Sequence, residues 1–164
     1  MRIQARVVPF VLFFLLVATP RSAAAGGAEG SVEYQGKSVV FRHAYLVKGP
    51  DAVDPSVVIR ELVLSAADVG AEIEACKSMS CVSGALTEGM TVDLDAGPRL
   101  NYWVVLKGGM VQYSGTEDPA ALTLGTREAG RLAGRLVLDR TASGGPKVDV
   151  EFDATLLRTF ETAR

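Results

Sequence analysis

Residues 99–115, RLNYWVVLKGGMVQYSG, contain the clearest structural signal in the chain. Apolar and aromatic side chains alternate between two faces on either side of Lys107-Gly108-Gly109, and glycine accepts the positive φ angles that tight hairpin turns need. The pattern therefore predicts a β-hairpin. Because the stretch holds the only tryptophan and two of the four tyrosines, we expect the hairpin to anchor a hydrophobic core.

Short runs in which successive side chains alternate between two faces, as in β-strands, fill much of the remaining chain. In 38–47 both faces carry apolar residues, with Phe41, His43 and Tyr45 on one of them, so this run is expected at the centre of a sheet. In 147–153 valine and phenylalanine alternate with charged residues, which predicts a half-buried strand. Further strands are predicted at 31–35, 56–64, 90–94, 120–124 and 131–138.

Helical signals are few. Residues 65–77 change from a period of two to helical spacing, and Ser65 with Asp68 forms a capping box. Gly70 weakens this segment, so the predicted helix is short. Residues 155–164 are expected to end the chain as a short helix or a tail.

The fold class predicted from these elements is mainly β. About eight short strands with one short helix are typical of an antiparallel β-sandwich or a closed barrel, and periodicity does not separate the two. Helices do not alternate with strands, as they would in a doubly wound parallel sheet. We expect one domain over 26–164, with the small residues 26–30 as a flexible leader.

The first 25 residues have the features of a signal peptide. Arg2 and Arg6 precede an apolar run at 7–18, and Ala23-Ala24-Ala25 offers a cleavage site after Ala25. A membrane-spanning helix needs roughly 20 apolar residues, so this run is too short for one. We therefore expect an exported protein, periplasmic or secreted, with no stable membrane span after cleavage.

The charge balance excludes one class of partner. The chain has 19 acidic and 17 basic residues, and removal of residues 1–25 would take away only arginines from this set. A mildly acidic domain without a basic run is a poor candidate for binding nucleic acid.

The two cysteines lie close together in CKSMSC. In an exported chain, Cys76 and Cys81 predict one local disulfide, which would stabilise the fold by roughly 2 kcal/mol. The alternative is a soft-metal site of the copper type, with Cys76, Met79 and Cys81 as ligands. That alternative requires reduced thiols.

Five short fragments spread over most of the chain after residue 25 share a β-like character. They are Gly36-Lys37, His43-Ala44-Tyr45, Leu62-Val63-Leu64-Ser65, Ala133-Gly134-Arg135-Leu136 and Val150-Glu151-Phe152-Asp153-Ala154. Together they resemble a group of small secreted bacterial proteins that are uncharacterised. The resemblance implies a secreted β-rich domain, and it implies no activity and no site residues.

Aromatic residues and the single histidine are the candidate contacts. Tyr102 and Trp103 are neighbours on one strand and so point to opposite faces, which leaves one of them on a second face that is either surface or cavity. Trp103, Tyr102, Tyr113 and His43 are therefore candidates for contact with a ligand or partner. For each of them, packing in or near the core is the competing interpretation. Any Ser-His or Cys-His mechanism would have to use His43.

Acidic residues are numerous, and no spacing selects a catalytic pair. Asp93 and Asp95 alternate along one predicted strand, and Asp149, Glu151 and Asp153 along another, so we expect each set to line a solvated face. Glu61 beside Arg60 indicates that one edge of its strand meets water. A hydrolase that uses two carboxylates stays open as a third hypothesis.

The sequence thus favours a non-enzymatic, exported binding module. Its partner is expected to be a protein or a small ligand of the cell envelope, and no residue pattern calls for a cofactor. Soft-metal handling through the cysteine loop is the alternative.

Overall fold

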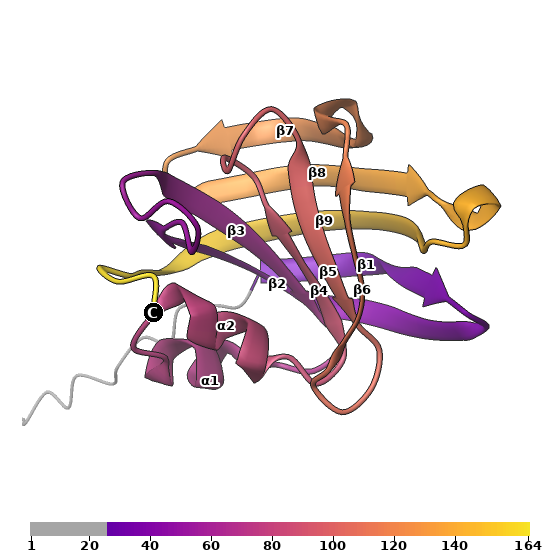
Figure 1. The fold of residues 1–164 in the computed structure, drawn as a ribbon, viewed down its shortest axis with the longest axis horizontal. Coiled ribbons are helices and arrows are strands. Elements are labelled where there is room, and N and C mark those ends of the chain that lie inside the picture. The colour runs from indigo at the N-terminus through magenta and orange to yellow at the C-terminus, as the bar shows by residue number, and fades with distance from the viewer. Residues whose placement is uncertain (1–25) are drawn as a thin grey trace, which may run out of the picture.

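The structure, a computed structural model, describes residues 26–164, which form a nine-stranded, mainly antiparallel sheet with two short helices (Figure 1). The predicted signal peptide, 1–25, lies outside the described residues. The strands are β1 (Gly26–Tyr34), β2 (Lys37–Pro50), β3 (Val58–Ser65), β4 (Gly89–Asp93), β5 (Leu100–Val105), β6 (Val111–Glu117), β7 (Leu122–Glu128), β8 (Arg131–Asp139) and β9 (Lys147–Thr159). The helices are α1 (Gly70–Ala75) and α2 (Met79–Ala85), with single turns η1 (Pro119–Ala121) and η2 (Thr141–Ser143).

The predicted hairpin is present as β5 and β6. Trp103 pairs with Ser114, and the register shifts by a bulge beside Val105. Gly108 and Gly109 both have a φ of 73°, the left-handed region that favours glycine. The turn chemistry of the sequence therefore located this element correctly.

The strand order is β6-β5-β4-β3-β2-β1-β9-β8-β7, so β2 is the central strand, as predicted. Figure 1 shows β1, β9, β8 and β7 running across the view while β3 to β6 cross them more steeply. The one sheet is folded over on itself into two facing layers. Within the described chain its edge strands, β6 and β7, are not paired with each other, so the barrel alternative is wrong.

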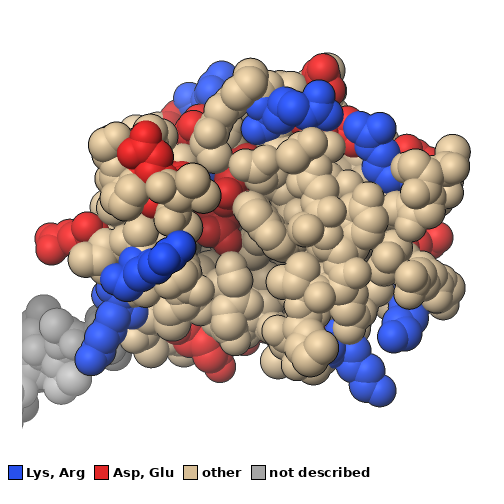
Figure 2. Space-filling model, in the orientation of Figure 1, with Lys and Arg blue, Asp and Glu red and all other residues tan. Residues whose placement is uncertain are grey.

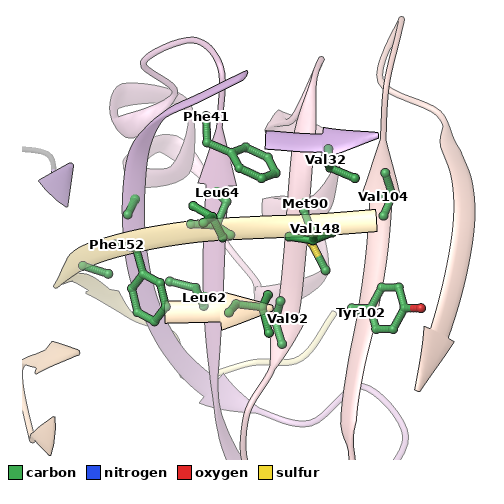
Figure 3. Packing of buried hydrophobic residues seen from close by; sticks show 14 of the residues in the cluster. Val32, Phe41, Leu62, Leu64, Met90, Val92, Tyr102, Val104, Val148 and Phe152 are labelled. Atoms are coloured by element: carbon green, nitrogen blue, oxygen red, sulfur yellow. The ribbon is translucent and has the colours of Figure 1, made fainter. Parts of the chain in front are cut away.

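The main core fills the space between the two layers (Figure 3). One layer contributes residues such as Leu62, Met90 and Tyr102, and the other contributes residues such as Val148 and Phe152. All five are less than 5% exposed. The alternation of 147–153 is thus confirmed, because its apolar face lies in this core and its charged face is outside.

We call the layer that contains β3 to β6 the front layer. A second apolar cluster lies on its outer face, away from the main core. Ile73 of α1 and Val82 of α2 pack against Tyr45, Val63 and Val105 of the sheet. The helices therefore cover part of the sheet face that the main core leaves free. As a result, all five residues of β4 are buried.

The two faces of β2 are not those that strict alternation predicts. Phe41 and Ala44 both belong to the main core although they are three residues apart, and Tyr45 belongs to the outer cluster. The first part of β2 pairs with β1, and the second part pairs with β3 and, in parallel, with β9. The change of partners interrupts the alternation, so the prediction of Phe41 and Tyr45 on one face was wrong.

Two further local predictions were wrong, and a third was partly right. Residues 26–30 are not a free leader, because they are part of β1 and pair with β9. Residues 155–159 continue β9 as a strand, since the edge of β2 is open to them. The short helix predicted within 65–77 is present as α1, but it begins at Gly70 and not at a Ser65 cap, because Ser65 is the last residue of β3. The second helix, α2, was not predicted.

The end of the chain fastens α2 to the sheet. The amides of Met79 and Ser80 donate to the carbonyls of Thr162 and Ala163, and the Phe160 amide donates to Lys48 on β2. These bonds place the first turn of α2 directly against the second half of β2.

Gly49 permits this close approach. A Cβ atom at Gly49 would lie 2.5 Å from the Met79 Cγ and 3.0 Å from the Phe160 Cβ. We therefore expect Gly49→Val to lower the free energy of unfolding by about 2 kcal/mol, because an added side chain overpacks this contact. Urea denaturation measures the change. Gly27→Val is the matched control, since a Cβ there meets nothing within 4 Å, and equal losses in the two variants would contradict the assignment.

Candidate functional site

A pocket of about 260 Å³ lies on the outer face of the front layer, between α2 and the loop that joins β2 to β3. Figure 2 shows atoms of acidic residues, in red, inside a hollow on this side of the molecule. The strands β3 and β4 form the floor, α2 and the loop form two walls, and β5 with the start of β6 forms a third. The lining residues are Pro50, Ala52, Ile59, Glu61, Met79, Ser80, Ser83, Thr91, Asp93, Trp103 and Val111.

Two carboxyl groups lie side by side on the floor. Glu61 of β3 and Asp93 of β4 are direct partners across the antiparallel pair, and such partners have Cβ atoms about 4.5–5.5 Å apart. Their exposed fractions are only 6% and 9%. Two acidic side chains are therefore brought together on a face that is largely apolar.

The environment raises the pKa of both carboxyl groups. Burial, followed by the nearby Asp93 carboxylate, raises the pKa of Glu61 to about 8. Burial, followed by the charge of Asp51 in the loop, raises the pKa of Asp93 to about 7. At neutral pH the pair therefore carries much less than two negative charges.

The floor also holds polar atoms without a partner. Among the described residues, neither Oε1 of Glu61 nor Oγ1 of Thr91 has a hydrogen-bond partner of normal geometry, and both atoms are buried. The Thr91 hydroxyl lies close enough to Glu61 to lower the pKa of that carboxyl somewhat against the effect of burial. Thr91 is only 2% exposed. Buried polar groups normally have partners, and leaving one without costs about 1–3 kcal/mol. These atoms are thus available to a molecule in the pocket.

The loop wall is braced by its own hydrogen bonds. Oδ1 of Asp51 accepts from the amides of Val53 and Asp54, and Oδ1 of Asp54 accepts from the amide and hydroxyl of Ser56. Further along the sheet, Arg60 makes two hydrogen bonds to Asp95. Arg60 is next to Glu61 in the sequence, but its charge is paired with Asp95 and not with Glu61.

The structure separates the four predicted contact residues. Trp103 lines the pocket, whereas Tyr102 lies in the main core, 2% exposed. The ring of Tyr113 stacks on Tyr102 with 6.0 Å between centroids. His43 stacks on Tyr45 with 6.3 Å between centroids and does not line the pocket. Only Trp103 therefore belongs to this site.

The cysteine pair forms the predicted disulfide. Cys76 and Cys81 are joined, and the bridge connects the end of α1 to the first turn of α2. Met79 lies between them in sequence and lines the pocket. A closed bridge offers no thiolate, so soft-metal binding by this loop needs the reduced protein. The disulfide is compatible with an extracellular location. Within 26–164, no helix is long and apolar enough to cross a membrane.

The predictions for the acidic residues were partly right. Asp149 and Asp153 lie on the outer, solvated face of β9 and pair with Arg135 and Arg131. Asp93 was expected on a solvated face and is instead buried, because α2 and the loop cover this part of β4.

Glu61 and Thr91 were missed altogether as site residues. Glu61 was interpreted as a sign of water beside its strand. The useful signal was that Ile59, Glu61 and Val63 alternate, which places one carboxyl group on an otherwise apolar face.

The surroundings shift the pKa values of the two carboxyl groups in the same direction. Here burial and like charge raise both pKa values. The pair is suited to change its charge when a cation or hydrogen-bond donor arrives.

Glu61 should make the stability of the protein fall as the pH rises. Because its pKa is higher in the folded state, the folded protein binds more protons than the unfolded chain between about pH 4.5 and about pH 8. Glu61→Gln keeps the shape of the neutral acid and removes this loss. We expect the variant to match the original protein near pH 5 and to be more stable near pH 9 by on the order of 3 kcal/mol.

Thermal or urea denaturation over this pH range measures the difference. Glu151→Gln, on the exposed face of β9, is the control and should change the free energy of unfolding by less than about 0.5 kcal/mol at either pH. Parallel pH profiles for the original protein and Glu61→Gln would show that Glu61 is not a buried neutral acid.

The chain was also compared with known proteins. No family model, no curated protein and no solved structure matches it.

Proposed function

We propose that this protein is an exported, non-enzymatic binding module that takes a small ligand into the pocket beneath α2. The observation that carries the proposal is the pocket floor, where buried polar atoms of Glu61 and Thr91 have no partner among the described residues. A ligand that supplies hydrogen-bond donors would satisfy them.

The shape and lining of the pocket support a small organic ligand. Ligand sites typically combine apolar walls with a few placed polar groups. Ile59, Met79 and Trp103 supply the apolar walls here, and the carboxyl pair supplies the polar groups. The volume of about 260 Å³ lies just below the roughly 300–1,000 Å³ of drug-sized sites, so the ligand is small.

Export is supported by the apolar run at 7–18 with its small-residue cleavage site and by the disulfide. The proposed location is the periplasm or the exterior of the cell. There the bridge between Cys76 and Cys81 would stay closed and hold α1 and α2, and with them one wall of the pocket.

Trp103 gives a direct test of ligand binding, since it is the only tryptophan and lines the pocket. We expect some members of a panel of small neutral, anionic and cationic organic fragments to change its fluorescence in a saturable way. Ser83→Phe places a ring in the pocket and should weaken these hits by about tenfold or more, which corresponds to 1.4 kcal/mol.

Gly84→Phe is the matched control on the same helix. A Cβ at Gly84 meets nothing within 4 Å, so this variant should bind as the original protein does. If no fragment gives a saturable response, or if Ser83→Phe binds as well as Gly84→Phe, the pocket is not a ligand site.

Export and the state of the cysteines are tested together by the intact mass of protein recovered from its own cell envelope without reductant. We expect a chain that begins at Gly26 and is two hydrogens lighter than the reduced form. Free thiols with the added mass of a metal would instead favour soft-metal handling by Cys76, Met79 and Cys81.

A further inference from the structure

We propose that the ligand of this pocket is a small organic cation, with its ammonium group between Glu61 and Asp93 and its apolar body against Trp103. The inference rests on the proposed function and names the class of ligand for the same pocket. It follows from three properties of the site: its acceptors, its charge and its walls.

The floor offers several hydrogen-bond acceptors to a ligand that carries donors. Oε1 of Glu61 and Oγ1 of Thr91 are both unpartnered and buried, and Asp93 adds a second carboxyl group to the same floor. An ammonium group has three N–H donors and no acceptor, so it can donate to several of these oxygens at once. Hydrogen bonds between charged groups are also stronger than neutral ones.

The charge of the site is not balanced by the protein. Among the described lining residues there is no lysine, arginine or histidine. Arg60, the neighbour of Glu61, is held by Asp95 through two hydrogen bonds of 2.7 and 2.8 Å. Asp51 adds a further negative charge from the loop. A cation is therefore the partner that this floor lacks.

The walls favour an organic cation over a metal ion. Within residues 26–164, no group of three or more His, Cys, Asp or Glu side chains could hold a metal ion, and calcium takes six to eight oxygen ligands. Apolar atoms of Ile59, Met79 and Trp103 form much of the walls, beside Ser80 and Ser83 of α2. The tryptophan ring adds an attraction for ammonium groups, because its face is electron-rich.

Binding of a cation should release protons from the floor. The Glu61 and Asp93 carboxyl groups are partly protonated at neutral pH, and a nearby positive charge favours their ionised form. The charged groups that face them are each other and Asp51 of the loop. Arg164 also contacts the loop, at the carbonyl of Ala52, while α2 and β5 present no ionisable side chain to the pocket. Affinity for a cation should therefore rise with pH, by up to about tenfold per pH unit for each proton released.

Three probes of nearly the same shape and different charge test the inference: cyclohexylamine, cyclohexanol and cyclohexanecarboxylate. Trp103 fluorescence and calorimetry report their binding near pH 6 and near pH 8.5. We expect the amine to bind more tightly than the alcohol and the carboxylate, and to gain about tenfold or more between the two pH values. The alcohol should show little pH dependence.

Glu61→Gln and Asp93→Asn remove the charges and keep the shape of the floor. Each should reduce the preference for the amine over the alcohol by about tenfold and flatten its pH dependence, while the binding of the alcohol is kept. Glu151→Gln, on the far side of the fold, is the control and should behave as the original protein does.

The outcomes separate this inference from the proposed function. If the alcohol or the carboxylate binds in the pocket as tightly as the amine, the ligand is not a cation, and the binding module stands. If none of the three probes changes Trp103 fluorescence, the cation inference fails. The proposed function fails with it only when the wider fragment panel also gives no response that Ser83→Phe abolishes.

Discussion

The strand β2 belongs to both layers of this fold, and the packing of the other elements depends on it. Its first half pairs with β1, and its second half pairs with β3 on one side and with the end of β9 on the other. The second half of β2 must be apolar on both faces, because one face meets the main core and the other meets the helices, whereas Val40 and Arg42 of the first half are exposed. The crossing of Phe41, Ala44 and Tyr45 between the two clusters reflects that requirement.

The covering of the outer face also explains why two acidic residues are buried. The strands β3 and β4 have the main core behind them and α2 with the loop in front, so Glu61 and Asp93 have little contact with water. An ionised carboxylate in such a place costs several kcal/mol unless it has a partner of opposite charge. The charge on this floor is therefore conditional. Burial suppresses it, and a nearby cation would favour it, so the proposed recognition and the stability of the fold would depend on the same two side chains.

Patterns within short stretches of sequence predicted the structural features that depend only on residues close together in the chain. The glycine turn at 108–109 and the alternation of Val148, Val150 and Phe152 each located a strand, and the short spacing of the cysteines predicted their bridge. The floor of the pocket was not predictable in this way. Alternation shows that Glu61 and Asp93 each share a face with other residues, but not that a helix from elsewhere in the chain covers that face. The extension of β9 past residue 154 was missed for the same reason, because its partner is the distant edge of β2.

The bonds from Thr162 and Ala163 to α2 have a practical meaning for anyone who labels this molecule. They support the first turn of α2, which forms one wall of the pocket, so a purification tag or fluorophore joined after Arg164 would lie beside that helix and strain its first turn. The turn at Gly130, between β7 and β8, is a better place for a reporter. A side chain there meets no neighbouring atom, and the turn belongs to the layer on the other side of the main core.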